Sequence, residues 1–295
     1  MKVFITGGSG YIGSVVVPLL LDAGHSVLAL ARSPESAAKL NAFQNVEVVQ
    51  GDLNDVEVLK EAASRSDAVI HLGFNHDFGN FAKSAQTDLD AIKAIGEVLA
   101  GTGKAFIGTS GTGIAIGVPG VLKEDFRPSN TLIPRVELEK VLLALKDVGV
   151  RSLVVRLPFT VHGPGKKGFI PTYVEILKSL GAAEYVGDGN NKWPAVNLAD
   201  AALLYKLVLE KGTAGSIYHG IGEQGIPFKD IAAEVAKGLN VHTKSILNAQ
   251  AQEDYLWLAM FVLADVQALS EATQKELGWK PVHGGLFEDI KVYTS

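Results

Sequence analysis

The sequence predicts an α/β protein in which helices cover both faces of a doubly wound parallel sheet, followed by a smaller C-terminal lobe. Short apolar runs alternate with amphipathic stretches through residues 1–160, which is the pattern of parallel strands joined by helices. A glycine-rich turn directly follows the first apolar run. After about residue 160 the alternation loosens into connections such as GPGKKG and GDGNNKWP. Residues 161–295 are therefore expected to form a lobe that is interleaved with the end of the sheet.

The individual elements follow from the same patterns. The first predicted helix, 12–23, contains Pro18, which removes one backbone hydrogen bond and is expected to kink the helix. The apolar segment WLAMFVLAD, 257–265, predicts a buried helix. Strands are predicted at 2–6, 26–31, 46–51, 68–73, 104–109 and 151–157, and later helices near 170–180, 198–210 and 227–239.

The composition restricts the class of partner. With 47% hydrophobic and 20% charged residues, 295 residues suffice for a sizeable core. A net charge of −5 without a basic run argues against nucleic acid or an anionic membrane surface and favours a small-molecule substrate. No uninterrupted apolar stretch is long enough to span a membrane. The absence of Cys and an N-terminal strand that leaves no room for a signal peptide predict a cytoplasmic protein.

The segment TGGSGYIG, residues 6–13, predicts a dinucleotide site. Gly7, Gly10 and Gly13 lie between a strand and a helix, where they permit a tight turn, close approach of the pyrophosphate and helix-on-strand packing. The N-terminus of the following helix offers backbone N–H groups to phosphates. This combination is typical of a Rossmann fold.

The end of the second predicted strand indicates which dinucleotide is bound. Arg32 and Ser33 stand where a carboxylate would accept hydrogen bonds from an unphosphorylated ribose, and a guanidinium binds a 2′-phosphate. NADP(H) is therefore favoured, with NAD(H) as the alternative if Arg32 is only a solvated charge. Asp52, after the third strand, is expected at the adenine amino group or as the N-cap of a helix starting near Val56.

With these motifs the chain resembles the short-chain dehydrogenase/reductase superfamily, in its extended branch of NAD(P)-dependent epimerases, dehydratases and reductases. TGGSGYIG, GDL at 51–53, HLG at 71–73, RLPFTVHGPG at 156–165 and GDGNNKWPAVNLADAA at 187–202 carry the resemblance. It implies a Rossmann lobe, a C-terminal substrate lobe, and cofactor contacts from Gly7, Gly10, Tyr11, Ile12, Gly13, Arg32, Ser33, Asp52, Leu53, Leu72, Gly73, Thr109, Arg135 and Pro158.

The chain departs from the superfamily at its catalytic Tyr and Lys, which lie four residues apart on one helix face. Placing Glu139 on the family's glutamate aligns Thr131 with the Tyr and Arg135 with the Lys. Thr131 is a poor proton donor because an aliphatic hydroxyl titrates far above neutral pH. Arg135 can bind ribose hydroxyls or a phosphate but cannot release a proton; alternatively it pairs with Glu139 on the surface. Lys140 points about 140° away from Arg135 and is expected in solvent.

Two histidines are the alternative proton donors. His162 stands where the family more often has a Tyr, and His76 lies beyond the fourth predicted strand beside Asp77. A histidine titrates near neutral pH and could protonate an alkoxide as hydride arrives, although either ring could instead be held by backbone groups. His71, His76 and Asp77 match no metal-ligand spacing, so no metal is expected.

Hydroxyls and aromatic rings supply the remaining candidates. Thr109, Ser110 and Thr112 follow the fifth strand, where one hydroxyl is expected to polarise a substrate carbonyl unless these residues only end the strand. The segment is not a hydrolase elbow because GTSGT lacks a Gly two residues after the Ser. Substrate contacts are predicted for Phe74, Tyr185 and Trp193, with core packing as the alternative.

The sequence thus predicts an NADP(H)-dependent oxidoreductase that reduces a small aldehyde, ketone or related unsaturated compound and uses an atypical proton donor. One alternative is a redox-sensing NAD(P)-binding protein without turnover. Another alternative is a nucleotide-sugar epimerase or dehydratase. It is disfavoured because the related epimerases and dehydratases rely on the Tyr and Lys pair. The resemblance also makes a homodimer through the predicted helices near 83–99 and 131–147 one expectation, and the alternative is that the apolar VLLAL, 141–145, belongs to the core.

Overall fold

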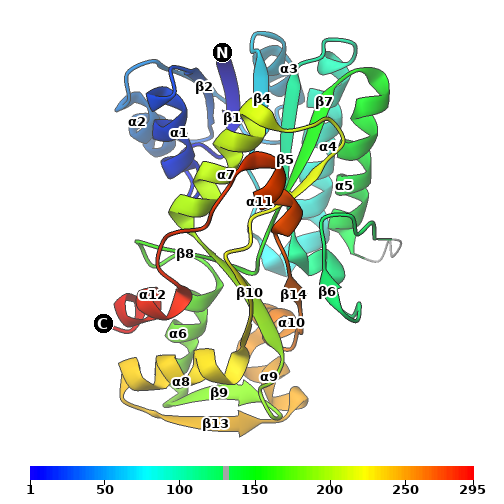
Figure 1. The fold of residues 1–295 in the computed structure, drawn as a ribbon. Coiled ribbons are helices and arrows are strands. Elements are labelled where there is room, and N and C mark those ends of the chain that lie inside the picture. The colour runs from blue at the N-terminus through cyan, green and yellow to red at the C-terminus, as the bar shows by residue number, and fades with distance from the viewer. Residues whose placement is uncertain (129–132) are drawn as a thin grey trace.

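The computed structural model describes residues 1–128 and 133–295, and it is built on a seven-stranded parallel sheet (Figure 1). The strand order is β11-β7-β5-β4-β1-β2-β3. Their bounds are β1 Lys2–Thr6, β2 Ser26–Ala31, β3 Val46–Gln50, β4 Ala68–His71, β5 Ala105–Gly111, β7 Arg151–Leu157 and β11 Ile217–His219. The six predicted strands are confirmed, and the Rossmann-like fold with them. β11 arrives from the C-terminal half of the chain to extend the sheet.

Helices cover both faces of this sheet, each over its own apolar core. On one face, α1 packs against α7, and α1 continues through Pro18. On the other face, α3 packs against α4 and α4 against α5. Their bounds are α1 Gly13–Asp22, α2 Pro34–Asn41, α3 Val56–Ser64, α4 Phe81–Leu99, α5 Pro134–Ala144 and α7 Leu198–Lys211.

The C-terminal lobe lies beyond the carboxyl ends of the strands and has an aromatic-rich core (Figure 1). One small sheet contains β8 (Thr160–His162), β10 (Lys192–Asn197) and β12 (Glu223–Pro227). In two further sheets, β9 (Ala182–Val186) pairs with β13 (His242–Ile246), and β6 (Val121–Leu122) pairs with β14 (Gln267–Ala268). Its helices are α6 Phe169–Leu180, α8 Phe228–Leu239, α9 Asn248–Tyr255, α10 Ala259–Val262 and α12 Leu286–Thr294, whereas α11 Glu271–Leu277 packs against α7 and β11 of the main sheet. The lobe thus covers the sheet edge where α/β proteins bind ligands.

The segment predicted as one buried helix at 257–265 is instead a 3₁₀ turn, η4 (Leu256–Leu258), followed by the short helix α10. The predicted helix is thus confirmed only over α10, which ends at Val262, and the positive φ of 49° at Leu256 separates this segment from α9. Phe261 is buried but Met260 is 48% exposed, so the segment covers the core with one side only.

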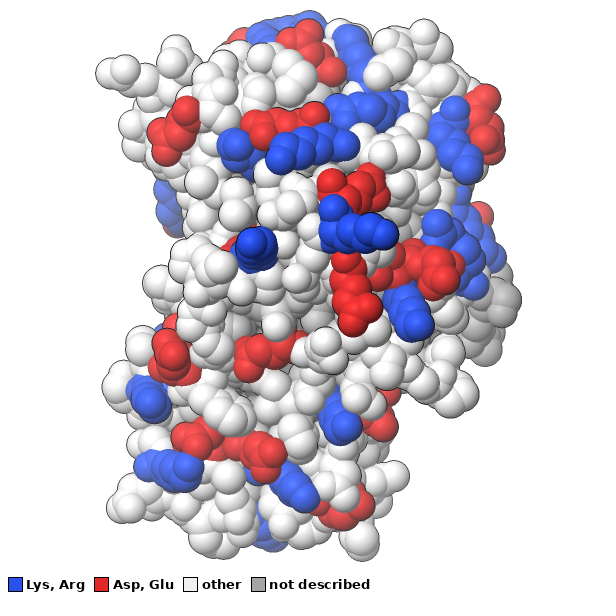
Figure 2. Space-filling model, in the orientation of Figure 1, with Lys and Arg blue, Asp and Glu red and all other residues white. Residues whose placement is uncertain are grey.

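Charged side chains of both signs are interspersed on the visible face of the molecule (Figure 2). Within residues 1–128 and 133–295, no helix is both long and apolar enough to cross a bilayer. The same residues contain no cluster of three or more acidic or histidine side chains arranged to hold a metal ion.

Candidate active site

The glycine-rich loop between β1 and α1 has the tight geometry that a dinucleotide requires. Gly7 adopts φ 71°, and a Cβ there would lie 2.7 Å from the backbone nitrogen of Gly73. A Cβ on Gly13 would lie 2.1 Å from the carbonyl oxygen of Gly7. Among the described residues no side chain caps the N-terminus of α1, which leaves its first N–H groups for an anionic ligand. These residues fit a bound pyrophosphate.

At the adenine end, Arg32 is exposed directly after β2, as a 2′-phosphate ligand would need to be. Ser33 instead caps α2, since its hydroxyl accepts a hydrogen bond from the Ser36 N–H at 3.2 Å. The carboxylate of Asp52 accepts from the Asn54 N–H at 2.7 Å. The N-cap of α3 is Asp55, so the alternative that Asp52 caps this helix was wrong.

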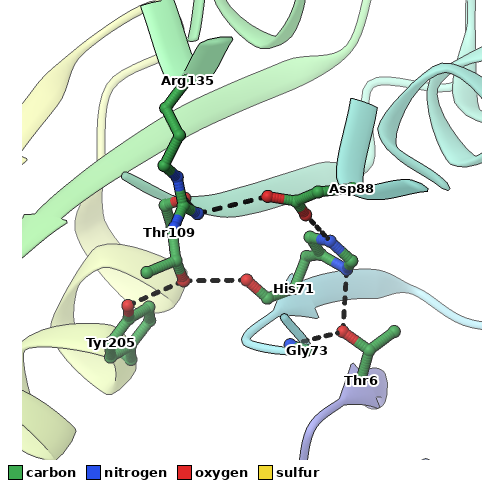
Figure 3. Close-up of polar contacts among 7 residues, drawn as sticks. All are labelled: Thr6, His71, Gly73, Asp88, Thr109, Arg135 and Tyr205. Atoms are coloured by element: carbon green, nitrogen blue, oxygen red, sulfur yellow. Dashed lines mark hydrogen bonds and ion pairs between the residues drawn. The ribbon is translucent and has the colours of Figure 1, made fainter. Parts of the chain in front are cut away.

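A buried line of polar contacts crosses the carboxyl ends of β1 and β4 (Figure 3). His71 Nδ1 lies 2.7 Å from the Thr6 hydroxyl, and its Nε2 lies 2.8 Å from Asp88. The other carboxylate oxygen of Asp88 accepts from Arg135 at 3.2 Å. Sequence reasoning missed Asp88, although a carboxylate on the otherwise apolar face of α4, between Ala85 and Ile92, is a detectable signal.

This network holds Arg135 at the site instead of in a surface pair. Its guanidinium donates to the carbonyl oxygen of Thr109 at 3.0 Å and lies 4.5 Å from the centre of the Phe74 ring. Its Nε has no hydrogen-bond partner among the described residues. Glu139 is buried and pairs with Arg156, so the predicted alternative of an Arg135–Glu139 surface pair was wrong. Lys140 is exposed, as predicted.

The three hydroxyls after β5 differ in how they are used. The Thr109 hydroxyl lies 2.8 Å from the carbonyl oxygen of His71 and 2.8 Å from the Tyr205 hydroxyl, so it is fully engaged (Figure 3). Ser110 and Thr112 are buried, and neither hydroxyl has a partner within the described part of the chain. A buried hydroxyl without a partner costs about 1–3 kcal/mol, which a ligand or ordered water would recover.

His162 is buried between two half-buried carboxylates, and its contact with one of them connects β8 to α12. Its Nδ1 is 2.6 Å from Asp289, and its Nε2 is 3.6 Å from Glu223. Burial alone would lower the pKa of His162, but Glu223 and Asp289 outweigh it and raise the pKa above its usual value. Asp289 engages only Nδ1, and Nε2 is a buried atom without a hydrogen-bond partner among the described residues, so the role of His162 as proton donor stays a prediction.

His76 is exposed beyond β4, and its ring meets Phe74 edge-on at 5.2 Å. Desolvation against its neighbours and the positive charge of Arg135 lower the pKa of His76 below its usual value. His76 and Arg135 thus flank the same ring at the sheet edge, and the role of His76 as proton donor stays a prediction. Thr131, the other candidate donor, lies outside the described residues.

The predicted substrate contacts separate in space. Phe74 is half-buried at the sheet edge, below Arg135. Trp193 is fully buried, and its indole N–H donates to the carbonyl oxygen of Phe261 at 2.8 Å, so it supports the lobe from inside. Tyr185 lies on β9, in the outer sheet at the far end of the lobe (Figure 1). The structure brings Phe74 to the site and places the other two in the lobe's own packing.

Comparisons with known proteins agree with this geometry. Residues 3–220 match the NAD dependent epimerase/dehydratase family. An uncharacterised Saccharomyces cerevisiae protein, YLL056C, is 47% identical over 100% of this chain and 99% of its own length. A 2-alkyl-3-oxoalkanoate reductase of Stenotrophomonas maltophilia is 28% identical over 80% of this chain and 74% of its length.

Among solved structures, the fold is shared with the dTDP-glucose 4,6-dehydratase DesIV of Streptomyces venezuelae, crystallised with NAD and TYD. The TM-score is 0.80 at 19% identity, over 100% of this chain and 96% of that chain. The fold, the glycine-rich loop and the match over residues 3–220 lead to one assignment. The chain belongs to the NAD-dependent epimerase/dehydratase family and is an enzyme of the NAD(P)-dependent oxidoreductase type.

Proposed function

We propose that this enzyme is an NADP(H)-dependent reductase of small carbonyl compounds. The observation that carries the proposal is the buried hydroxyl of Thr112, just past the carboxyl end of β5, which has no hydrogen-bond partner among the described residues. Open α/β sheets bind their ligands at this edge. The unpartnered hydroxyl of Ser110 lies two residues earlier. The resemblance to a relative named as an oxoalkanoate reductase supports a carbonyl substrate.

When bound, the dinucleotide supplies the hydride. Thr112 and Ser110 are the chain's own donors for the carbonyl oxygen, which a hydrogen bond from either would polarise. The guanidinium of Arg135 is held by Asp88 and the Thr109 carbonyl, and its fixed charge favours the negative oxygen that hydride addition creates. It also offers to a ribose hydroxyl or to substrate its Nε–H, which has no partner within the part of the chain that the structure describes.

The proton comes from His76 in this scheme. Because the pKa of His76 is lowered, the ring becomes protonated at a lower pH than an ordinary histidine. A reductase that depends on this proton therefore speeds up as the pH falls through that pKa. His76→Gln should remove this acid limb from a pH profile of kcat/KM and leave NADPH affinity unchanged.

The proposal is tested by following NADPH absorbance with a panel of aldehydes and ketones. Thr112→Val keeps the shape of the side chain but removes the hydroxyl, and should lower kcat/KM about 100-fold, the usual loss for one oxyanion donor. Ser152→Ala is the matched control. Ser152 is also buried without a hydrogen-bond partner among the described residues, but it lies near the N-terminal end of β7, away from the carboxyl ends of the strands. NADPH binding without turnover of any carbonyl would instead favour a redox sensor.

Preference for NADP(H) is the second part of the proposal, and Arg32 is its test. Arg32→Ala should weaken NADPH binding by about 10-fold to 100-fold, the loss expected for a charge-assisted hydrogen bond, and leave NADH affinity nearly unchanged. Lys39→Ala removes a nearby charge from α2 and should affect both cofactors little. Isothermal titration of the wild type and both variants with each nucleotide gives the six dissociation constants. An equal loss for NADPH and NADH would contradict a 2′-phosphate contact.

A further inference from the structure

A cluster of aromatic rings joins the two lobes, and it is called here the aromatic bridge. Phe78 and Trp257 stack almost parallel, with ring centres 4.3 Å apart and planes 5° apart. Phe78 also meets Phe169 at 5.7 Å. The members come from the segment after β4 and from the C-terminal lobe, namely Phe74, Phe78, Phe81, Phe169, Trp257 and Phe261.

One end of the aromatic bridge contacts the proposed catalytic group Arg135, and the other end packs beside the segment that follows Thr112. At one end, Phe74 lies under the guanidinium of Arg135, which itself contacts the carbonyl of Thr109. At the other end, Phe261 packs on Phe159 at 5.5 Å. A Cβ built on Gly113, the neighbour of Thr112, would lie 3.5 Å from Phe159. The rings therefore extend from Arg135 to the neighbourhood of Gly113, the residue after Thr112.

These rings are not simply core. Phe74, Phe78, Phe169 and Trp257 are only half-buried, whereas the other two tryptophans, Trp193 and Trp279, are fully buried. An apolar surface left partly exposed beside polar catalytic groups is typical of a ligand site, which is mostly apolar with a few placed polar atoms.

The backbone next to Trp257 gives a second, independent observation. Leu256 adopts φ 49° and ψ −119°, a region that residues with a side chain rarely enter. Its own side chain is 71% exposed, so packing of that side chain does not explain the conformation. The turn it creates sets the direction of the chain immediately before Trp257. Strain of this kind clusters at ligand-binding segments.

We infer that the carbonyl substrate is a planar aromatic or conjugated compound, whose ring packs on the aromatic bridge while its carbonyl oxygen faces Thr112 and Ser110. This inference rests on the proposed reductase function and names its substrate class. Phe78 and Trp257 are then the specificity-determining residues. Offset or edge-on ring contacts of the kind seen within the bridge would be repeated with the substrate.

Binding can be measured without turnover, because Trp257 is a natural reporter. Benzaldehyde and cyclohexanecarbaldehyde have the same carbon skeleton but differ in planarity, and each is titrated into enzyme saturated with NADP⁺ while tryptophan emission is recorded. Benzaldehyde should change the emission saturably, with a Kd about 10-fold lower than that of cyclohexanecarbaldehyde. Trp257→Phe keeps an aromatic ring but should lose the change in emission. Any change that remains in this variant measures the light absorbed by the ligand and is subtracted.

Phe78→Leu keeps apolar bulk and removes the ring, so it should bring the two Kd values to within about threefold of each other. Phe43→Leu is the control, because Phe43 is a half-buried phenylalanine after α2 on the other half of the sheet. Equal affinity of the wild type for the two aldehydes would overturn the inference, as would a Phe78→Leu variant that still discriminates between them.

The reductase proposal and the aromatic inference fail in different ways. If NADPH is oxidised equally well with both aldehydes and the emission shows no preference, the reductase stands and the aromatic subsite is wrong. If the emission discriminates but neither aldehyde nor any other carbonyl is reduced, the subsite stands and the reductase is wrong. The emission assay therefore tests the rings separately from the chemistry.

Discussion

Gly13→Ala should weaken NADPH binding at least 10-fold and destabilise the fold by about 1–3 kcal/mol, the usual range for overpacking. The added Cβ would lie 2.1 Å from the carbonyl oxygen of Gly7 and 2.7 Å from the Cα of Gly8. Both are backbone atoms of the loop that is expected to hold the pyrophosphate, so neither can move without changing that loop. Isothermal titration with NADPH and urea unfolding measure the two effects.

The direction of the change in stability is informative, because alanine is intrinsically a better helix former than glycine by about 1 kcal/mol. Gly13 is the first residue of α1, and without the contact to Gly7 its replacement would be neutral or stabilising. Gly222→Ala serves as the control, since a Cβ there makes only ordinary contacts of 3.4 Å or more. A Gly13→Ala protein that binds NADPH like the wild type would show that the loop does not hold the cofactor.

Glu139→Ala should lower the free energy of unfolding by about 3–5 kcal/mol, because it leaves a buried charge without its partner. Arg156 is 0% exposed, and its Nε donates to Glu139 at 3.0 Å. The same guanidinium donates to the carbonyl oxygen of Phe126 at 2.8 Å. Urea unfolding of the variant and the wild type measures the difference. Because Glu139 is one turn after Arg135 on α5, the variant should also disturb the site.

His219 completes the surroundings of Arg156 as a neutral ring. Burial and the charge of Arg156 lower the pKa of His219 to about 4. The ring nitrogen Nδ1 lies 2.7 Å from the Leu269 carbonyl and acts as donor, which leaves Nε2 to accept from Arg156 at 3.2 Å. At neutral pH the only negative charge on this guanidinium is that of Glu139, among its described contacts. The loss in Glu139→Ala is therefore not compensated by His219.

Two further variants make the interpretation specific. Glu137→Gln changes an exposed carboxylate on the same helix and should shift stability by no more than about 0.5 kcal/mol. The double variant Glu139→Leu with Arg156→Met replaces the pair by apolar side chains and should recover most of the stability. A loss below 1 kcal/mol in Glu139→Ala would mean that water reaches Arg156 and that the pair does not anchor α5.

The strands and the glycine-rich loop were predictable because each depends on neighbours in the sequence. Apolar runs of the right length gave six of the seven strands of the main sheet, and β11, only three residues long, carried too weak a signal. The spacing of Gly7, Gly10 and Gly13 between a strand and a helix indicated the dinucleotide loop. Local conformation and periodicity suffice for such features.

The contact partners of charged and aromatic side chains could not be predicted from neighbours in the sequence. Glu139 pairs with Arg156 instead of with Arg135 one turn away, and His162 finds Asp289 across 127 residues. Phe78 and Trp257 meet only because the C-terminal lobe folds over the carboxyl ends of the strands. Burial makes such contacts strong, and burial depends on which elements pack together. Sequence neighbours therefore determined the sheet and the cofactor loop, whereas long-range packing decided which polar and aromatic groups surround them.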